Sequence, residues 1–202
     1  MKLSTRELVT IAVFGTLWGI SEMTLGGVLK SLDIPMAGMF LAAIGLTVAM
    51  VGRLFVPKRG TTLFIGVIAM LLKLFSLGGV IIGPMVGIFT EALLAELVLS
   101  IKKTPNAASL MVAGAAGVTW VVGQPFVTGP ILFGRTVFVV WLDFLDTARR
   151  VLGLGNSALF IVLGLYILIH IVVGGVAGML AWNVGKQVYA RLGKSAVNVA
   201  EG

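Results

Sequence analysis

Three pairs of residues in this sequence combine an aromatic ring with a polar side chain four positions further along. The pairs are Trp18 with Glu22, Trp120 with Gln124, and Tyr166 with His170. A separation of four places both members of a pair on the same face of a helix. A flat heterocycle needs both kinds of group, the ring for stacking and the polar group for orientation. The pairs therefore predict a binding site for such a solute.

Ionisable residues inside apolar stretches extend this candidate site. A charge in the middle of a bilayer costs roughly 2.5–3.5 kcal/mol on insertion scales, so each one invites a functional hypothesis. Besides Glu22 and His170, the apolar stretches contain Lys73, Glu91 and Glu96. Because the carboxylates outnumber the lysine, we expect a cationic or amine-bearing ligand.

The predicted roles differ among these residues. Glu91 would accept hydrogen bonds from the amine of the ligand, and Gly87 on the same helix face leaves room beside the carboxylate. His170 and Gln124 would orient the ligand, and Trp120 would stack on it.

Structural roles are open for several of the same residues. Glu22 and Lys73 would form an ion pair at similar depth, and His170 would be a hydrogen-bonded histidine between helices. Glu96 would pair with the lysines at 102–103 or with a partner subunit.

The sequence carries no motif for the common catalytic chemistries. It has no cysteine and one histidine, and it lacks the phosphate-binding G-x-x-x-x-G-K-[ST], the zinc-binding H-E-x-x-H and the nucleophile motif G-x-S-x-G. We therefore expect no enzymatic activity, no metal and no cofactor.

Composition sets the class of protein that must position these residues. The 202 residues are 58% apolar and 11% charged, with a mean hydropathy of +1.10. An average soluble domain is roughly 45–50% apolar and about 25% charged. These values argue against a soluble enzyme, a disordered chain or a nucleic-acid binder, and the net charge of +7 then reflects membrane topology. We expect an all-α integral membrane protein, multi-pass in the cell membrane.

Apolar runs long enough for a hydrocarbon core of ~30 Å predict six transmembrane helices in one domain, 1–202. Their ranges are 7–28, 34–53, 60–79, 81–101, 106–128 and 156–185. The segments are continuous rather than alternating, which argues against a barrel.

The distribution of basic residues predicts the orientation. With both ends of the chain in the cytoplasm, ten of the 15 Lys and Arg fall on the inner side. The other five are Lys30, Lys73, Arg135, Arg149 and Arg150.

Residues 130–152 are too charged for a seventh span. Apolar residues at helical spacing predict instead an amphipathic helix, either interfacial or a lid on the outer surface. These residues are Val137, Val140, Trp141, Phe144 and Leu145. We also expect Pro84, Pro125 and Pro130 to break helices near this surface, exposing backbone groups to a solute.

Small residues one turn apart predict close helix packing, as in Gly83-x-x-x-Gly87 and Gly174-x-x-x-Gly178. In the first helix, Ala12, Gly15, Thr16 and Gly19 would form a smooth face for a partner membrane subunit.

These features together resemble the substrate-binding (S) components of energy-coupling factor transporters, nearest to those for thiamine or its hydroxymethylpyrimidine precursor. The similarity extends loosely over about residues 10–190. It centres on Pro35-Met36-Ala37-Gly38-Met39, on Gly83-Pro84-Met85 with the 91–96 region, and on 173–186.

The resemblance implies a binding subunit that takes a vitamin from outside and works with a transmembrane coupling subunit and two cytosolic ATPases. It implies a substrate among the outer halves of the fourth to sixth helices. It also implies docking through an Ala-x-x-x-Ala pattern of the first helix, whose nearest equivalents are Ala12 with Thr16 and Gly15 with Gly19. The rival hypothesis is a stand-alone permease or channel in which Glu22, Lys73, Glu91 and His170 relay protons or ions.

Overall fold

The computed structural model describes residues 2–76, 81–101, 104–152 and 159–200, and this part of the chain is helical without any strand. Its helices are α1 (Thr5–Ser31), α2 (Ala37–Phe55), α3 (Thr61–Leu72), the short 3₁₀ helix η1 (Lys73–Phe75), α4 (Ile82–Ile101), α5 (Ala107–Phe133), α6 (Val137–Leu152) and α7 (Leu159–Ala200). The predicted all-α class is confirmed.

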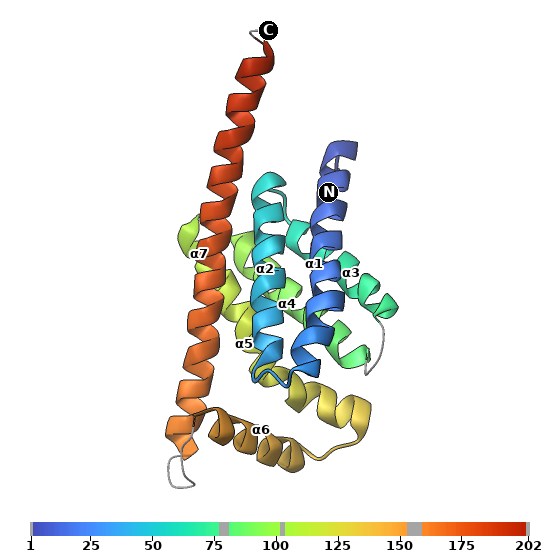
Figure 1. Ribbon diagram of the computed structural model, residues 1–202, viewed down its shortest axis with the longest axis vertical. Helices are drawn as coiled ribbons and strands as arrows, with labels where there is room; N and C mark the ends of the chain where they lie inside the picture. The colour runs from blue at the N-terminus through green and yellow to red at the C-terminus, as the bar shows by residue number, and fades with distance from the viewer. Residues whose placement is uncertain (1, 77–80, 102–103, 153–158, 201–202) are drawn as a thin grey trace.

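The helices form a bundle with α6 across one end (Figure 1). Helices α1, α2 and α7 run along the long axis, and α3, α4 and α5 lie behind them at an incline. Both ends of the chain lie at the end of the bundle opposite α6. We call these the chain-end side and the α6 side.

Within the residues that the structure describes, five helices are long and apolar enough to cross a membrane, namely α1, α2, α4, α5 and α7. The predicted third span, 60–79, corresponds in its described part to the shorter apolar helix Thr61–Phe75. At 1.5 Å per residue this helix is about 22 Å long, which is less than a hydrocarbon core of ~30 Å.

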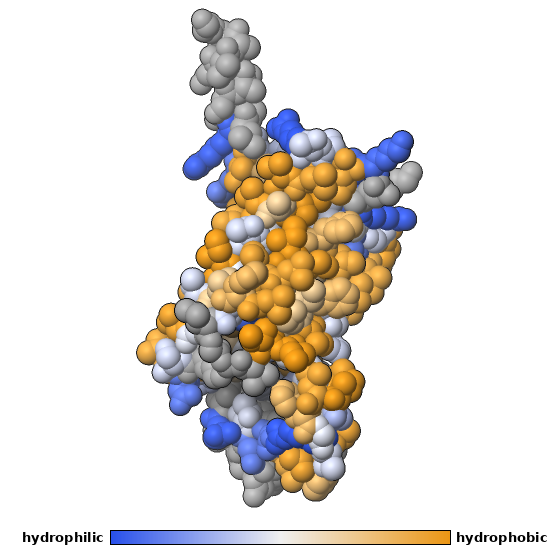
Figure 2. All heavy atoms as spheres, turned by 90° about the vertical axis from the view of Figure 1, so that its right-hand side faces the viewer, coloured by the Kyte–Doolittle hydropathy of each residue, from blue (hydrophilic) through white to orange (hydrophobic). Residues whose placement is uncertain are grey.

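On the face shown in Figure 2, hydrophobic side chains cover a wide band across the middle, hydrophilic ones gather toward both ends, and further hydrophobic ones lie at the lower end. Exposed apolar side chains on α1 belong to this band: Leu8, Val9, Val13, Leu17 and Ile20. Exposing such a surface to water is unfavourable in free energy, whereas contact with lipid is favourable. The band therefore indicates a membrane protein.

Helices α5 and α7 pack with their backbones in contact. A Cβ added at Gly174 would meet the carbonyl of Gly114, and one added at Gly178 would meet the carbonyl of Leu110. The predicted role of Gly174-x-x-x-Gly178 in packing is confirmed. The same packing role is not found for Gly83, because a Cβ there would meet nothing within 4 Å.

Segment 130–152 is not one element. Helix α5 continues through Pro125 and Pro130 to Phe133, so the predicted breaks at these prolines are wrong. A proline removes one backbone N–H, and neighbouring helices let a membrane helix tolerate that loss. Pro84 lies in the first turn of α4, where its missing N–H would have had no partner in the helix.

Helix α6 is amphipathic, as its spacing predicts. Val140 and Leu145 are buried, and Trp141 is half-buried, whereas Val137 is 58% exposed. The side chain of Phe144, which was predicted for the same face, lies outside the described residues.

A buried carboxylate holds the chain-end side of the bundle together. Glu96 of α4 accepts hydrogen bonds from the backbone N–H groups of Gly60 and Thr62, at 2.7 and 2.9 Å. These donors belong to the first turn of α3, so Glu96 caps that helix from a neighbouring one. Its Oε1 also lies 3.7 Å from Nη2 of Arg53, which is 1% exposed. The predicted pairing with the lysines at 102–103 concerns residues outside the described part.

We expect Glu96→Gln to lower the free energy of unfolding by about 3 kcal/mol, because it leaves the buried Arg53 guanidinium without a counter-ion. Thermal unfolding of the detergent-solubilised chain measures the change. Glu7→Gln is the matched control, since Glu7 pairs with Lys58 at a partly exposed position. An equal loss of stability in both variants would contradict the assigned role of Glu96.

Candidate functional site

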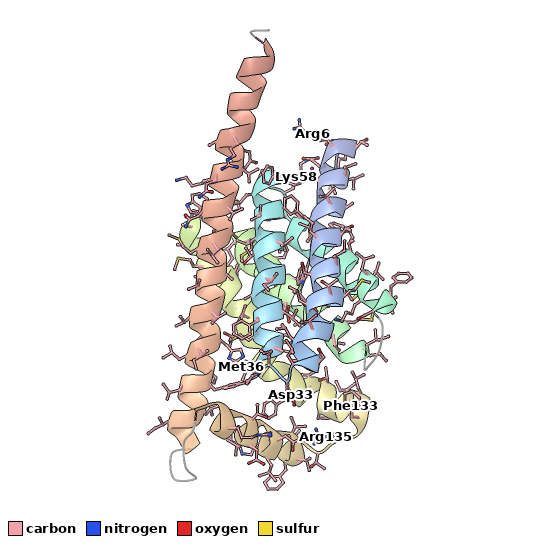
Figure 3. The ribbon with its side chains drawn as sticks, viewed as in Figure 1. Arg6, Asp33, Met36, Lys58, Phe133 and Arg135 are labelled. Carbon is pink, nitrogen blue, oxygen red and sulfur yellow. The ribbon has the colours of Figure 1, made fainter. Side chains whose placement is uncertain are left out.

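A pocket of about 520 Å³ opens among the α6-side ends of the helices. Its walls come from α1, the α1–α2 turn, α2, η1, α4 and α5. Asp33 and Met36 mark the turn at this end of the bundle (Figure 3). Volumes of roughly 300–1,000 Å³ are typical of small-molecule sites.

Four of the seven residues predicted to bind a ligand line this pocket: Glu22, Lys73, Glu91 and Gln124. They come from four elements, α1, η1, α4 and α5, so the chain folds to bring them together. Trp120, Tyr166 and His170 do not line it.

Glu22 and Lys73 form an ion pair. Nζ of Lys73 donates a hydrogen bond to the backbone carbonyl of Glu22 at 2.9 Å and lies 3.4 Å from its Oε2. Both residues are buried, at 5% and 8% exposure. The ion pair that the sequence analysis gave as a structural role is therefore present. Both residues also line the pocket.

Glu91 differs from every other buried carboxylate in the described residues. Glu91 is 5% exposed and lines the pocket. Within the described residues, its Oε2 has no hydrogen-bond partner. A buried polar atom without a partner is costly, which points to a ligand donor or water at this position. Gly87, one turn away on α4, also lines the pocket.

Gln124 connects α5 to α4. Its Nε2 donates to the carbonyl of Gly83 at 2.8 Å. A Cβ at Gly87 would lie 2.6 Å from its Oε1, so the glycine makes room for the amide. This contact orients Gln124 at the pocket wall.

The remaining predicted residues lie elsewhere. His170 is fully buried, with Nδ1 2.8 Å from the carbonyl of Tyr166 and the two rings 4.7 Å apart. Tyr166 lines a second hollow of about 270 Å³, which also involves Arg135 and Asp143 beside α6. Trp120 is half-buried, and its Nε1 has no hydrogen-bond partner within the described residues.

Asp33, Ser76, Gly26 and Gly38 also line the pocket and were not predicted. Gly26 follows Glu22 by four residues, so helical spacing could have placed it on the same face. Asp33 adopts a left-handed backbone conformation, with φ 52°, in the α1–α2 turn. Asp tolerates that region better than most residues, so Asp33 suits this turn. The sequence around Ser76 has no pattern that predicts its place in the pocket wall.

The helices pack tightly on the chain-end side of the pocket. Trp18, one turn before Glu22 on α1, is fully buried, and a Cβ at Gly45 of α2 would collide with its indole. A Cβ at Gly66 of α3 would likewise collide with Ala92 of α4. We call these two contacts, which lie on the chain-end side of the pocket, the Trp18 floor: Trp18 against Gly45, and Ala92 against Gly66.

The predicted docking face on α1 is divided. Ala12 and Thr16 are exposed, whereas Gly15 and Gly19 are buried. A Cβ at Gly15 would lie 2.7 Å from Ile68, and one at Gly19 would lie 2.6 Å from Leu72. The two glycines therefore pack α1 on α3 within the chain, and Ala12 and Thr16 remain candidates for a partner.

The lining of the pocket suits a positively charged solute. It contains three carboxylates, Glu22, Asp33 and Glu91, against one ammonium, Lys73. None of its residues in the described part of the chain is aromatic, so the predicted stacking by Trp120 has no counterpart there. Across the described residues, no group of three His, Cys, Asp or Glu is arranged to hold a metal ion.

We expect Gly45→Ala to lower the melting temperature, because the added methyl group collides with Trp18 and must separate α1 from α2. Gly175→Ala on α7 is the matched control, since a Cβ there meets nothing within 4 Å. Differential scanning fluorimetry in detergent measures both. An unchanged melting temperature for Gly45→Ala would mean that the floor is not tightly packed.

No protein-family model matches the chain, and neither a curated protein nor a solved structure matches it.

Proposed function

We propose that the chain is the membrane-embedded substrate-binding subunit of an ATP-driven importer of the energy-coupling factor type, and that it takes up a vitamin or related micronutrient across the cell membrane. The observation that carries this proposal is the pocket on the α6 side, with the unpartnered carboxylate oxygen of the buried Glu91 at its wall.

Charge supports a cationic or amine-bearing ligand. A buried carboxylate gains most from a donor that is itself charged, because the local dielectric is low. Glu91 would accept hydrogen bonds from the amine of the ligand. Gln124, which the carbonyl of Gly83 orients, would form a hydrogen bond with a neutral polar group of the ligand. Thiamine and its aminopyrimidine precursor carry such groups, and polar contacts rather than ring stacking would recognise them at this pocket.

Tight helix packing on the chain-end side supports a binding subunit over a channel. The Trp18 floor and the Glu96 cluster separate the pocket from that side. Release into the cytoplasm would then require the whole subunit to reorient. Because the sequence has no phosphate-binding loop, ATP hydrolysis would come from partner subunits together with a transmembrane coupling protein.

The rival permease hypothesis needs a relay that includes His170. This histidine hydrogen-bonds within α7 and does not line the pocket that Glu22, Lys73 and Glu91 share. The geometry therefore favours the binding subunit.

We expect purified protein to bind one member of a panel of thiamine, hydroxymethylpyrimidine, riboflavin, biotin and haem. Glu91→Gln should weaken that binding at least about tenfold, because hydrogen bonds to a charged group are worth about 1.5–3 kcal/mol. Isothermal titration calorimetry in detergent measures both affinities, and Glu7→Gln on the chain-end side is the control.

Two results would overturn this proposal. One is the absence of saturable binding by any of the five compounds. The other is solute transport by the chain alone in proteoliposomes, without an ATPase, which would favour the permease.

We place both ends of the chain in the cytoplasm, in agreement with the excess of Lys and Arg on that side. The sequence has no cysteine, so single-cysteine variants give an unambiguous test. A membrane-impermeant maleimide on intact cells should label Thr136→Cys, between α5 and α6. It should label Arg59→Cys, between α2 and α3, only after permeabilisation. The reverse pattern would contradict the orientation.

A further inference from the structure

The pocket already contains a cation. The ammonium of Lys73 lies against α1, 2.9 Å from the backbone carbonyl of Glu22 and 3.4 Å from its carboxylate. Gly26 is adjacent to it, since a Cβ there would lie 3.3 Å from Nζ, a tight but not excluded contact. The ammonium therefore fits closely between α1 and the carboxylate of Glu22.

Two buried carboxylates face the pocket, and the lysine balances one of them. Glu22 is paired, whereas Oε2 of Glu91 has no partner in the described residues. Asp33, the third acidic residue of the lining, is exposed and therefore screened by solvent. The buried part of the pocket then has one carboxylate free for a ligand.

We infer that Lys73 determines the charge of the ligand: it occupies one of two cation positions, so the pocket accepts a solute with a single cationic group and rejects one with two. This inference rests on the proposed function and deepens it. A second ammonium would meet Lys73 instead of a free carboxylate, and two like charges repel strongly when both are removed from water.

The experiment compares two probes that differ by one ammonium group, n-butylamine and 1,4-diaminobutane. Their dissociation constants are measured by isothermal titration calorimetry on the full chain in detergent. We expect wild type to bind butylamine at least tenfold better than the diamine, and equal binding of the two would overturn the inference. We expect Lys73→Met to bind the diamine at least tenfold better than butylamine, because Glu22 becomes available.

Two controls separate selectivity from stability. Lys73→Arg keeps the charge and should retain the wild-type preference. Lys186→Met removes a lysine that lies over Trp182 on α7 and does not line the pocket, so the preference should not change. If Lys73→Met lowers the melting temperature but leaves the ratio of the two dissociation constants unchanged, the lysine is only structural and the inference is wrong.

A second variant covers the case in which Lys73→Met does not fold. Glu22→Gln removes the negative charge that balances Lys73, while the backbone carbonyl of residue 22 still holds the ammonium in the pocket, so its positive charge is no longer compensated there. We expect butylamine binding to weaken at least tenfold, and unchanged binding would overturn the inference. If wild type binds neither amine nor any compound of the vitamin panel, the proposed function fails as well, whereas wild-type butylamine binding with an unaltered ratio in Lys73→Met defeats this inference alone.

Discussion

Ionisable groups removed from water need partners, and the arrangement of this bundle follows from where those partners are found. Lys73 satisfies Glu22 near one end, while backbone donors of α3 and the guanidinium of Arg53 satisfy Glu96 near the other. Each of these links joins helices that are distant in sequence. Glu91 lies between the two clusters, and one of its oxygens has no partner in the described part of the chain, which leaves that oxygen for a solute in the pocket.

The two clusters have different consequences because their surroundings differ. At the chain-end side the donors enclose the carboxylate of Glu96, so the cluster acts as an internal cap that stabilises the start of α3. On the α6 side, glycines beside Glu22 and Glu91 leave space where side chains would otherwise fill the interior. The same kind of residue is thus structural in one setting and available to a solute in the other.

Much of this arrangement could be predicted from the sequence, because hydropathy locates apolar helices and intramembrane charges mark positions that need an explanation. For that reason, the sequence could indicate the four polar residues that meet in the pocket, namely Glu22, Lys73, Glu91 and Gln124. Spacing within one helix shows which residues share a face, but it does not show which neighbour that face meets. Tyr166 and His170 do share a face and their rings are close, yet they lie away from the pocket. The course of α5 through two prolines likewise depends on its neighbours and not on local preference.

The backbone contact between α5 and α7 also has a consequence for how the pocket can change shape. Because Gly114 and Gly174 bring the two backbones into contact, a relative displacement of α5 and α7 would disrupt close packing along this contact. The pocket wall that carries Val121 and Gln124 therefore belongs to a pair of helices whose backbones are in direct contact. Any widening of the pocket would therefore involve the elements that face this pair, α1, η1 and α4, rather than a separation of α5 from α7.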